Sequence, residues 1–571
     1  MPAPATYKWL VNRTNPEYVD YVARVASVPV PLAQVLINRG LKSAEQLDTF
    51  LRPSLQKLSD PFDLPGMADA VARIMEARRR GSRVFICGDY DADGVSATAI
   101  MVEMLGMLEI ECGYFIPNRI AHGYGFGREG IDAARRFGAD LIITVDCGIS
   151  AFETVAEAAA AGMDVIVTDH HEPGSHAGQR THAVPAAVAV VNPKLLPDET
   201  PLKHLCGAGV AFKLAQALFD NRLDDLQPLL DLAAIGTAAD VVPLIGDNRI
   251  FVREGLKLIQ SNQRVGIRAL KAASGIRPDY FKSSFLPFLL IPRINAAGRV
   301  DDAGAVVRLL TTRSEDEASE CAQWLQTLNS RRQEVEEVVF SEAQRQLTAQ
   351  AGGDGPIILA GEGWHPGVLG IVASRIAERY YRPVFVFALE DGIAKGSARS
   401  IPPFNLYEAL CECSALLKRF GGHRQAAGLA LAASDIDEFR QRIAQSMEKK
   451  LTADDFVRVI EIDAALQMSD ITYDLVHGIM QMEPFGYGNA EPIFGCRGLE
   501  PANPRIVGNN HLKMSLRGNG RGVDSIGFDF GGFFDMVESG TRIDAAFVPV
   551  INEWEGGRSI QLNLKAIRPA L

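Results

Sequence analysis

Long apolar segments are missing from this sequence. No stretch approaches the roughly 18 uninterrupted apolar residues that a membrane-spanning helix requires. Residues 1–13 also lack the apolar run of a secretion signal. We therefore expect a cytoplasmic protein without membrane contact.

Paired cysteines are missing as well. The chain has eight cysteines, but they form no CxxC pair and show no regular spacing. Their positions are Cys87, Cys112, Cys147, Cys206, Cys321, Cys411, Cys413 and Cys496. This pattern favours reduced thiols, again as expected in the cytoplasm.

An excess of positive charge is also absent, because 58 Lys and Arg face 70 Asp and Glu, a net charge of −12. Backbone affinity for nucleic acid comes from Lys and Arg that release counterions. The balance therefore argues against a protein that coats nucleic acid through its overall field, and any such binding must be local. Carboxylates that hold metal ions count as negative in this sum although bound ions neutralise them.

The length and composition fit a multidomain globular protein of the α/β class. The chain has 571 residues, of which 47% are hydrophobic and 22% charged, whereas single domains cluster at roughly 100 to 200 residues. We expect an N-terminal region, a parallel-sheet α/β domain with a helical part, a connecting helix, a second α/β domain and a C-terminal β-barrel. The predicted boundaries are 1–60, 61–325, 326–352, 353–452 and 453–571.

The first α/β domain is predicted from short β-branched runs that alternate with Ala-rich amphipathic stretches. The strand candidates are 84–86, 141–145 and 164–167, and the helix candidates are 97–108 and 152–161. Gly162 follows the second helix and suits a left-handed C-terminal cap.

The rest of the chain changes pattern twice. Residues 208–346 are mainly helical, and 330–340 indicate a long charged helix. A second α/β region follows the glycine cluster 352–355, with strands at 356–359 and 384–387. Near the C-terminus, 560–565 alternate apolar and polar residues after a hairpin turn at 555–558, as in a small antiparallel barrel.

Acids and imidazoles directly follow the strand candidates of the first domain. Three aspartates at alternate positions follow the first, Asp146 follows the second, Asp169, His170 and His171 follow the third, and Asp240 ends a fourth segment. The three alternate aspartates are Asp89, Asp91 and Asp93. Ligands of an open parallel sheet bind beyond the carboxyl ends of its strands, so we expect these side chains to converge.

So many carboxylates at one place require cations, because adjacent acids raise one another's pKa. Mixed carboxylate and imidazole ligands suit Mn²⁺ better than Mg²⁺, which remains the alternative. A calcium loop of the EF-hand type is disfavoured because Ile100 stands where the bidentate Glu is needed. A single aspartate at a strand end is more often a helix N-cap than a metal ligand, and only the joint occurrence favours a metal site.

These motifs resemble those of the DHH phosphoesterase family. The triplet Asp169-His170-His171, the segment 89–94, Asp146 and Asp240 match its metal motifs in the same order. The resemblance implies two Mn²⁺ ions with Asp146 as the bridging and catalytic ligand, and His171 facing the scissile phosphate. The implied metal ligands are Asp89, Asp91, Asp93, Asp146, His170 and Asp240.

Substrate-binding residues are implied by the same resemblance. Gly421-Gly422-His423 resembles the GGH motif of the substrate-binding domain that accompanies DHH domains, although its residues alone fit a simple turn before a helix. Basic sites at Arg119, at Arg299, and at Ser397 with Arg399 resemble a pocket that grips a 5′-terminal phosphate, where guanidinium groups fit phosphate oxygens.

The C-terminal barrel is similar in position to an OB fold that binds single strands by aromatic stacking. Phe485, Tyr487 and Trp554 are the stacking candidates, although an aromatic residue in a small barrel is more often part of the core. Together these resemblances imply a monomeric 5′→3′ exonuclease that hydrolyses single-stranded DNA to 5′-mononucleotides in recombination and repair. Single-strand-binding protein and a RecQ-type helicase are the implied partners.

Two alternatives of different kinds stay open on the sequence. A phosphodiesterase of short oligonucleotides or cyclic dinucleotides would share the metal motifs but would not need the barrel. An inactive single-strand-binding scaffold, resembling a replicative-helicase subunit, would keep the fold without its metals, and the intact acids speak against it.

Overall fold

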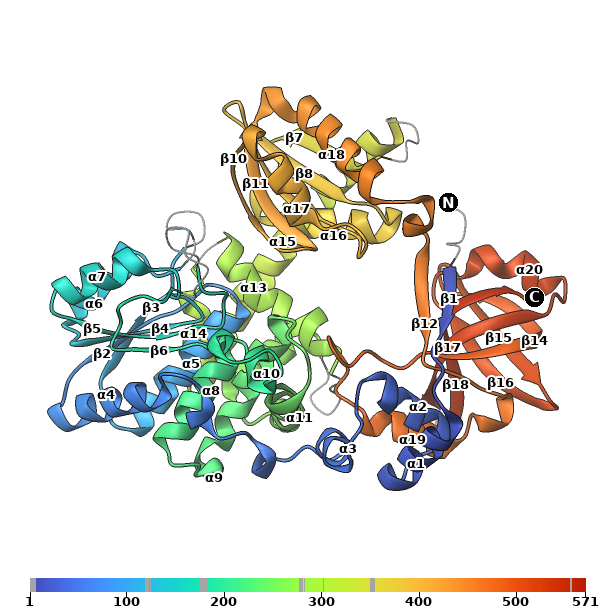
Figure 1. The fold of residues 1–571 in the computed structure, drawn as a ribbon, viewed down its shortest axis with the longest axis horizontal. Coiled ribbons are helices and arrows are strands. Elements are labelled where there is room, and N and C mark those ends of the chain that lie inside the picture. The colour runs from blue at the N-terminus through green and yellow to red at the C-terminus, as the bar shows by residue number, and fades with distance from the viewer. Residues whose placement is uncertain are drawn as a thin grey trace.

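The computed structural model describes residues 7–570 apart from 119–122, 124, 175–182, 277–280, 282, 301, 350–354, 555 and 556. Figure 1 shows three lobes at the corners of a triangle, with the N-terminal helices beside the C-terminal barrel. Among the described residues no single helix is long and apolar enough to cross a membrane, and only the bent pair of N-terminal helices meets that test jointly.

The first lobe contains a parallel five-stranded sheet with the order β3-β2-β4-β5-β6. Its strands are β2 (Val84–Cys87), β3 (Cys112–Phe115), β4 (Leu141–Val145), β5 (Asp164–Thr168) and β6 (Ala189–Val191). The three predicted strands are confirmed as β2, β4 and β5. The two additional strands, β3 and β6, form the edges, where a short apolar run suffices to pair with one neighbour.

Helices cover this sheet, and glycines with positive φ follow three of them. The helices are α4 (Met67–Arg80), α5 (Ala92–Met107), α6 (Arg128–Phe137) and α7 (Phe152–Ala160). Gly81 and Gly138 adopt left-handed C-terminal caps, and Gly162 has a φ of 82° just beyond α7, as predicted.

The helical part of this lobe packs against α5 and shares one hydrophobic core with the sheet. Its helices are α8 (Gly207–Leu218), α9 (Leu223–Leu226), α10 (Leu230–Ala239), α11 (Gly246–Ser261), α12 (Val265–Ala273), α13 (Ile291–Val300) and α14 (Gly304–Thr311). The predicted connecting helix, 326–352, falls in α15 (Glu315–Ala349) up to residue 349, and residues 350–352 lie outside the described part of the chain. Helix α15 starts against α12 and α13 and ends against the second lobe.

The second lobe is a five-stranded mixed sheet with the order β10-β11-β9-β8-β7. Its elements are β7 (Ile357–Glu362), α16 (Leu369–Tyr380), β8 (Val384–Glu390), β9 (Ile393–Arg399), α17 (Leu406–Glu412), β10 (Leu417–Gly422), β11 (Ala426–Ala432) and α18 (Ile436–Lys450). Both predicted strands of this region are confirmed as β7 and β8.

The C-terminal region is a barrel that closes where β14 pairs with β17. Its elements are β12 (Arg458–Ile462), β13 (Ala464–Ala465), α19 (Tyr473–Gln481), β14 (Phe494–Val507), β15 (His511–Gly518), β16 (Arg521–Gly527), α20 (Phe534–Glu538), β17 (Ile543–Trp554) and β18 (Gly557–Pro569). Strands β17 and β18 pair antiparallel on either side of the predicted turn at 555–558, of which residues 555 and 556 lie outside the described part of the chain. Strand β16 pairs with β18 in parallel, so the barrel is not wholly antiparallel.

The N-terminal region joins this barrel, although the two are far apart in the sequence (Figure 1). Strand β1 (Tyr7–Val11) pairs in parallel with β12. Helices α1 (Pro16–Ala26), α2 (Val30–Asn38) and α3 (Ala44–Leu51) contribute to the hydrophobic core of the barrel.

A buried arginine connects the first lobe to this unit. Arg249 of α11 donates to the carbonyl oxygens of Phe50 (2.8 Å), Met482 (2.8 Å) and Glu483 (3.0 Å), and its guanidinium stacks on the Phe50 ring. Burial lowers the pKa of Arg249 to about 9. Because a buried guanidinium without these acceptors is costly, its contacts hold the two lobes in one arrangement.

Candidate metal centre

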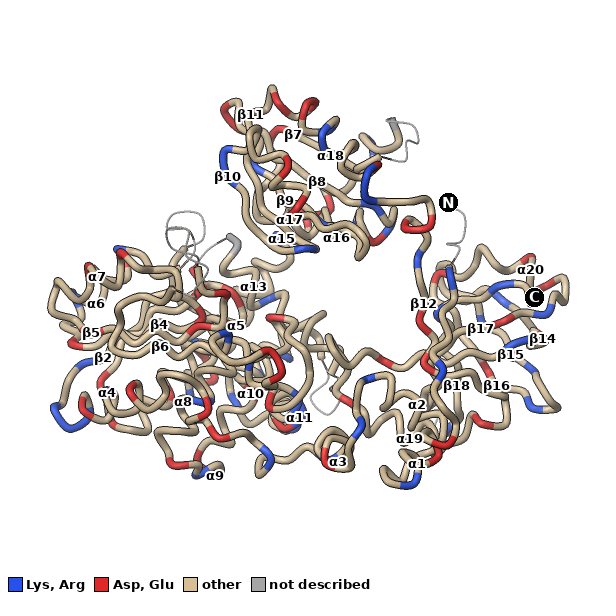
Figure 2. The backbone as a smooth tube through the Cα atoms, viewed as in Figure 1, with Lys and Arg blue, Asp and Glu red and all other residues tan. Residues whose placement is uncertain are grey.

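The carboxyl ends of three neighbouring strands bring the candidate ligands together. Asp89 follows β2, Asp146 follows β4, and His170 follows β5, all at one edge of the parallel sheet. Asp240 comes from elsewhere, since it is the C-cap of α10. Figure 2 shows acidic positions gathered in the interior of the first lobe beside α5.

His170 lies at the middle of this cluster. Its Nε2 is 3.0 Å from Asp146 Oδ1 and 3.8 Å from Asp93 Oδ2, and its Nδ1 is 3.6 Å from Asp240 Oδ2. Three sets of side chains each offer ligand atoms within 4.8 Å of one another, and they share members: Asp146, His170 and His171; Asp93, His170 and Asp240; Asp89, Asp91 and Asp146. The structure therefore brings together every residue that the sequence nominated for metal binding.

The loop after β2 is shaped by backbone hydrogen bonds to its acids. Asp91 is the N-cap of α5, and its Oδ1 accepts from the backbone N–H groups of Asp93 (3.0 Å) and Gly94 (3.1 Å). Asp93 in turn accepts from the N–H groups of Gly207 (2.6 Å) and Ala208 (2.8 Å) at the start of α8. Asp91 can thus cap α5 and also belong to the candidate ligand cluster, because the same loop conformation serves both roles.

Two glycines leave the space that these carboxylates occupy. A Cβ at Gly207 would lie 2.5 Å from Asp146 Cβ, and a Cβ at Gly236 would lie 2.5 Å from Asp93 Oδ1. Both distances are shorter than a van der Waals contact allows, so only glycine fits at either position without moving a candidate ligand. Sequence reasoning missed both residues, since nothing marks a glycine inside an apolar helix as part of a site.

Asp146 adopts an unusual backbone conformation, with φ at 60°. Aspartate tolerates this left-handed region better than most residues, and such strain gathers at functional sites. The backbone N–H of Asp146 donates to the Thr168 carbonyl (3.0 Å), which continues the β4–β5 pairing up to the turn. The turn therefore directs the Asp146 side chain towards His170 instead of along the strand.

Burial and mutual repulsion raise the pKa values of the acids. Burial, with the charge of Asp91, raises the pKa of Asp89 to about 8 and that of Asp93 to about 6. Burial and the charge of Asp93 raise the pKa of Asp240 to about 8, and that of Asp146 lies well above its usual range for the same causes. Burial, with the charge of His171, lowers the pKa of His170 to about 3, which leaves a neutral imidazole suited to metal ligation.

These features fit a divalent metal. Asp89 Oδ1 is buried and has no hydrogen-bond partner among the described residues, and unpaired buried polar atoms are rare in native proteins. Crowded, desolvated carboxylates with a neutral imidazole are stable together when a cation balances their charge. Oxygen ligands with one nitrogen suit Mn²⁺ or Mg²⁺.

His171 differs from His170 in its surroundings. Its Nδ1 lies 2.7 Å from Asp169 Oδ1, and its side chain is 42% exposed. Burial opposes protonation, but the hydrogen bond and charge of Asp169 raise the pKa of His171 to about 9. Asp169 also accepts from the backbone N–H of Ile149 (2.9 Å), so it orients His171 from a fixed position. The sequence pointed to Asp169 only as part of the triplet and did not predict this orienting role.

The predicted substrate residues of the second lobe lie on neighbouring strands. Ser397 and Arg399 of β9 pair with Gly428 and Ala426 of β11. A Cβ at Gly370 would lie 3.2 Å from Arg399 Nη2 and 3.6 Å from Ser397 Oγ, so both side chains lie over the start of α16.

His423 occupies the hairpin between β10 and β11, where its backbone N–H donates to the Ala426 carbonyl (2.8 Å). The turn thus joins two strands and does not precede a helix, because Gly422, with φ at 143°, permits the tight reversal of a hairpin. It ends beside the Ser397 and Arg399 pair, since Ala426 is the register partner of Arg399.

Several predicted residues fall wholly or partly outside the described part of the chain. Arg119 lies outside it, and for Arg299 and Trp554 the structure describes only the backbone, in α13 and β17. The segment before Arg299 does reach the centre: Asn295 Oδ1 accepts from the backbone N–H of Ala92 (2.8 Å). The role of Arg299 stays a prediction, and the contact that the structure describes in this segment is made by Asn295.

The two other stacking candidates differ in their surroundings. Phe485 is partly buried against the core of the barrel, which favours the structural interpretation. Tyr487 is 63% exposed, and its carbonyl accepts from the N–H of Leu244 (2.8 Å) near α11. Tyr487 therefore stays a predicted stacking residue, whereas Phe485 packs against the core.

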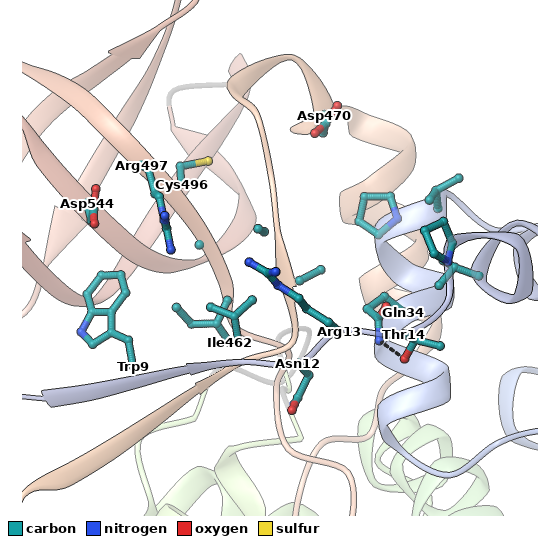
Figure 3. Close-up of a pocket in the computed structure, with 18 of the residues that line it drawn as sticks. Trp9, Asn12, Arg13, Thr14, Gln34, Ile462, Asp470, Cys496, Arg497 and Asp544 are labelled. Carbon is teal, nitrogen blue, oxygen red and sulfur yellow. Dashed lines mark hydrogen bonds between the residues drawn. The ribbon is translucent and has the colours of Figure 1, made fainter. Parts of the chain in front are cut away.

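A cavity of about 710 Å³ lies away from this centre, between the N-terminal segment and the barrel. Figure 3 shows Arg13 and Arg497 pointing into it from opposite sides, with Trp9 at one end. None of the candidate metal ligands lines this cavity. The cavity is therefore separate from the candidate metal centre.

Comparison with known proteins agrees with the fold and the centre. The family models described as "DHH family, N-terminal domain" and "DHHA1 domain" match residues 83–237 and 347–449. Fold and site thus define a DHH phosphoesterase. A third model, "RecJ OB domain", matches residues 462–566, the predicted OB barrel.

Relatives along the whole chain narrow the family further. The chain is 37% identical to the single-stranded-DNA-specific exonuclease RecJ of Salmonella typhimurium, over 95% of this chain and 96% of that protein. It is also 37% identical to RecJ of Bacillus subtilis, over 98% of this chain and 70% of that protein. The chain belongs to the RecJ family of single-stranded-DNA-specific exonucleases.

Solved structures give the same result. The crystal structure of RecJ with Mn²⁺ from Thermus thermophilus matches with a TM-score of 0.84 and 34% identity, over 99% of this chain and 80% of that one. The Mg²⁺ complex of the same protein matches with a TM-score of 0.77 and 32% identity, over 99% of this chain and 79% of that one. These findings confirm the predicted fold, including a barrel that the phosphodiesterase alternative would not need.

Proposed function

We propose that this chain is a metal-dependent exonuclease that removes 5′-mononucleotides from the 5′ end of single-stranded DNA, within recombination and repair. The observation that carries the proposal is the buried cluster around His170, in which carboxylates from separate elements meet an imidazole within ligand distance. Whole-length similarity to RecJ supports the choice of substrate.

The cluster would hold two divalent ions, Mn²⁺ in preference to Mg²⁺. Asp146 belongs to two of the three ligand sets, which supports its role as the shared ligand. Bound ions in such a site neutralise developing charge on a phosphate and lower the pKa of water, so no side-chain nucleophile is needed.

The remaining groups act on the substrate. His171, protonated and oriented by Asp169, donates a hydrogen bond to the scissile phosphate. Arg399 offers a half-buried guanidinium that no described carboxylate neutralises, and with Ser397 and His423 it binds the 5′-terminal phosphate. A site that recognises the end of the strand imposes the 5′→3′ direction.

The cellular setting follows from the family alone. We infer a monomeric cytoplasmic enzyme that works with single-strand-binding protein and a RecQ-type helicase, and that the barrel and Tyr487 guide the strand. The support is the RecJ similarity and the OB domain match.

Digestion of strands labelled at either end tests the proposal. With Mn²⁺, a strand labelled at the 5′ end should lose its label as mononucleotide at once, whereas a 3′-labelled strand should shorten progressively. Mg²⁺ should support a lower rate, and EDTA should stop the reaction. Equal release from both ends, or faster cleavage of dinucleotides than of long strands, would overturn it.

A further inference from the structure

A polar segment that the metal motifs do not include follows the edge strand of the first lobe. Strand β6 pairs in parallel with β5, and Val191 is the register partner of Thr168. Asn192 therefore leaves the sheet at the same level as Asp169, at the edge where the candidate ligands gather. Pro193 and Lys194 follow in a short 3₁₀ turn, Pro193–Leu195.

Asn192 fixes this turn to the DHH triplet. Its side chain is fully buried, its Nδ2 donates to the His171 carbonyl (3.0 Å), and its Oδ1 accepts from the backbone N–H of Lys194 (2.8 Å). One side chain thus sets the position of Lys194 relative to His171. A buried amide satisfied on both sides holds such a geometry rigidly.

The Lys194 ammonium has hydrogen-bonding capacity that the described residues do not use. Its side chain is 22% exposed, its Nζ lies 3.8 Å from Glu172 Oε1, and it donates no hydrogen bond to any residue in the described part of the chain. The buried lysines Lys213 and Lys271 differ, because Asp247 and Asn262 accept from them. The backbone of Lys194 is therefore held close to His171, and its ammonium has donors from which no described residue accepts a hydrogen bond.

The charge of Lys194 reaches the candidate metal ligands. After burial and His171, it contributes to the lowered pKa of His170, and it opposes the rise in the pKa of Asp240. Its distant ion pair with the exposed Glu172 adds little to stability, since exposed pairs contribute about 0 to 1 kcal/mol. This ion pair therefore gives little structural reason for a lysine at the edge of an acidic centre.

We propose that Lys194 binds the backbone phosphate that follows the scissile one, as a substrate-binding residue of the first lobe. The assignment rests on the proposed function: the scissile phosphate belongs to the metal ligands and His171, and the 5′-terminal phosphate belongs to the second lobe. In a strand with a 5′-phosphate, the terminal phosphate is the first and the scissile phosphate is the second. The third phosphate is the one that remains for Lys194. An ammonium suits it because it acts as a point charge without a fixed fork of donors.

The test compares Lys194→Ala and Lys194→Arg with a matched control. Lys203→Ala removes a nearby lysine of the turn Pro201–His204, whose ammonium already pairs with Asp198. Strand binding is measured by fluorescence anisotropy in EDTA, and KM and kcat are measured with Mn²⁺. Each variant receives a natural strand, one with a neutral methylphosphonate at the third phosphate, and one with a 5′-hydroxyl.

Lys194→Ala should raise Kd and KM about tenfold on the natural strand, with little change in kcat. The slope of the logarithm of the binding constant against the logarithm of the salt concentration should become shallower by about 0.7, because one phosphate contact is lost. On the methylphosphonate strand it should bind as well as the unsubstituted enzyme, whereas the defect should persist on the 5′-hydroxyl strand. Lys194→Arg should restore most of the affinity, and Lys203→Ala should change nothing.

A tenfold defect that persists on the methylphosphonate strand would overturn the proposal. So would a defect that vanishes on the 5′-hydroxyl strand, or an equal loss of Mn²⁺ affinity, which would indicate a structural role. Failure of the proposed function is visible separately, as absence of 5′-end preference in the unsubstituted enzyme.

Discussion

The sheet edge of the first lobe and the β9–β11 surface of the second lobe handle charge in opposite ways. At the sheet edge, acids are buried and partly held by backbone N–H groups, as Asp93 is by Gly207 and Ala208. On β9, Arg399 is half-buried and donates only to the neighbouring Ala398 carbonyl (2.9 Å), with no carboxylate nearby among the described residues. The geometry of the first region suits cations, whereas under the proposed function the second region binds an anion.

The difference teaches how one chain of net charge −12 can handle a polyanion. Its negative charge at the sheet edge is balanced by bound metal in the working state, so that edge does not repel phosphate. Under the proposed function, the positive groups that bind the strand are placed where they meet phosphates one at a time. Local placement, not overall field, determines binding.

The largest expected effect is at the sheet edge. Asp146→Ala should abolish hydrolysis, by at least about a thousandfold, because it removes a ligand shared by two candidate sets. Single-strand binding in EDTA should stay within a few-fold of normal, since the second lobe and barrel are unchanged. Gel assays of cleavage and anisotropy of binding check both parts, and appreciable cleavage by the variant would refute the shared role.

Gly207→Ala tests whether the glycine cradle positions the acids. The new Cβ would lie 2.5 Å from Asp146 Cβ and must displace it, and a shift of about 1 Å costs roughly a hundredfold in rate. Mn²⁺ affinity, measured by calorimetry, should fall in parallel. The control is Gly106→Ala in α5, where the new Cβ meets nothing within 4 Å.

Gly106→Ala should leave activity unchanged and raise stability by up to about 1 kcal/mol. Thermal melting shows whether Gly207→Ala still folds. Full activity in a folded Gly207→Ala variant would show that Asp146 can move without loss of function. The sheet edge would then not depend on a fixed arrangement of its acids.

Metal binding should depend on pH in a defined direction. Asp89 and Asp240 have pKa values near 8 in the metal-free protein, so they hold protons at pH 7 and must lose them to bind metal. Mn²⁺ affinity should therefore rise between pH 6 and 8. For each proton that metal binding releases, the rise should be up to about tenfold per pH unit. Calorimetry in two buffers of different ionisation enthalpy measures the number of protons released. An Mn²⁺ affinity that does not change with pH would contradict the raised pKa values of Asp89 and Asp240.

The smallest effect is expected in the second lobe. Arg399→Ala should weaken binding of 5′-phosphorylated strands about tenfold, the value of one charge-assisted hydrogen bond of about 1.5 kcal/mol, with Mn²⁺ affinity unchanged. Lys395→Ala is the matched control, because Lys395 lies on the same strand but pairs with Glu390 (3.0 Å). If the Arg399 variant binds 5′-phosphorylated strands as tightly as the unsubstituted enzyme does, the second lobe has no anion site at Arg399.

Local pattern was sufficient for much of the fold. Strands β2, β4 and β5 are apolar runs bounded by polar residues, and the acids after them converge because parallel strands end at one edge. The edge strands β3 and β6 were not predicted, since their runs are short and pair on one side only. Asn192 and Lys194 follow β6, so without that strand the sequence did not predict that they lie at the sheet edge.

The sequence by itself determined the ligand chemistry and the order of domains, because acid and imidazole positions after β-branched runs are local properties of the chain. Only the tertiary structure decided that Gly207 and Gly236 make room for Asp146 and Asp93, and that the N-terminal β1 pairs with β12. Those contacts join residues far apart in the chain. Their existence depends on how packed elements exclude volume, and no local pattern encodes that.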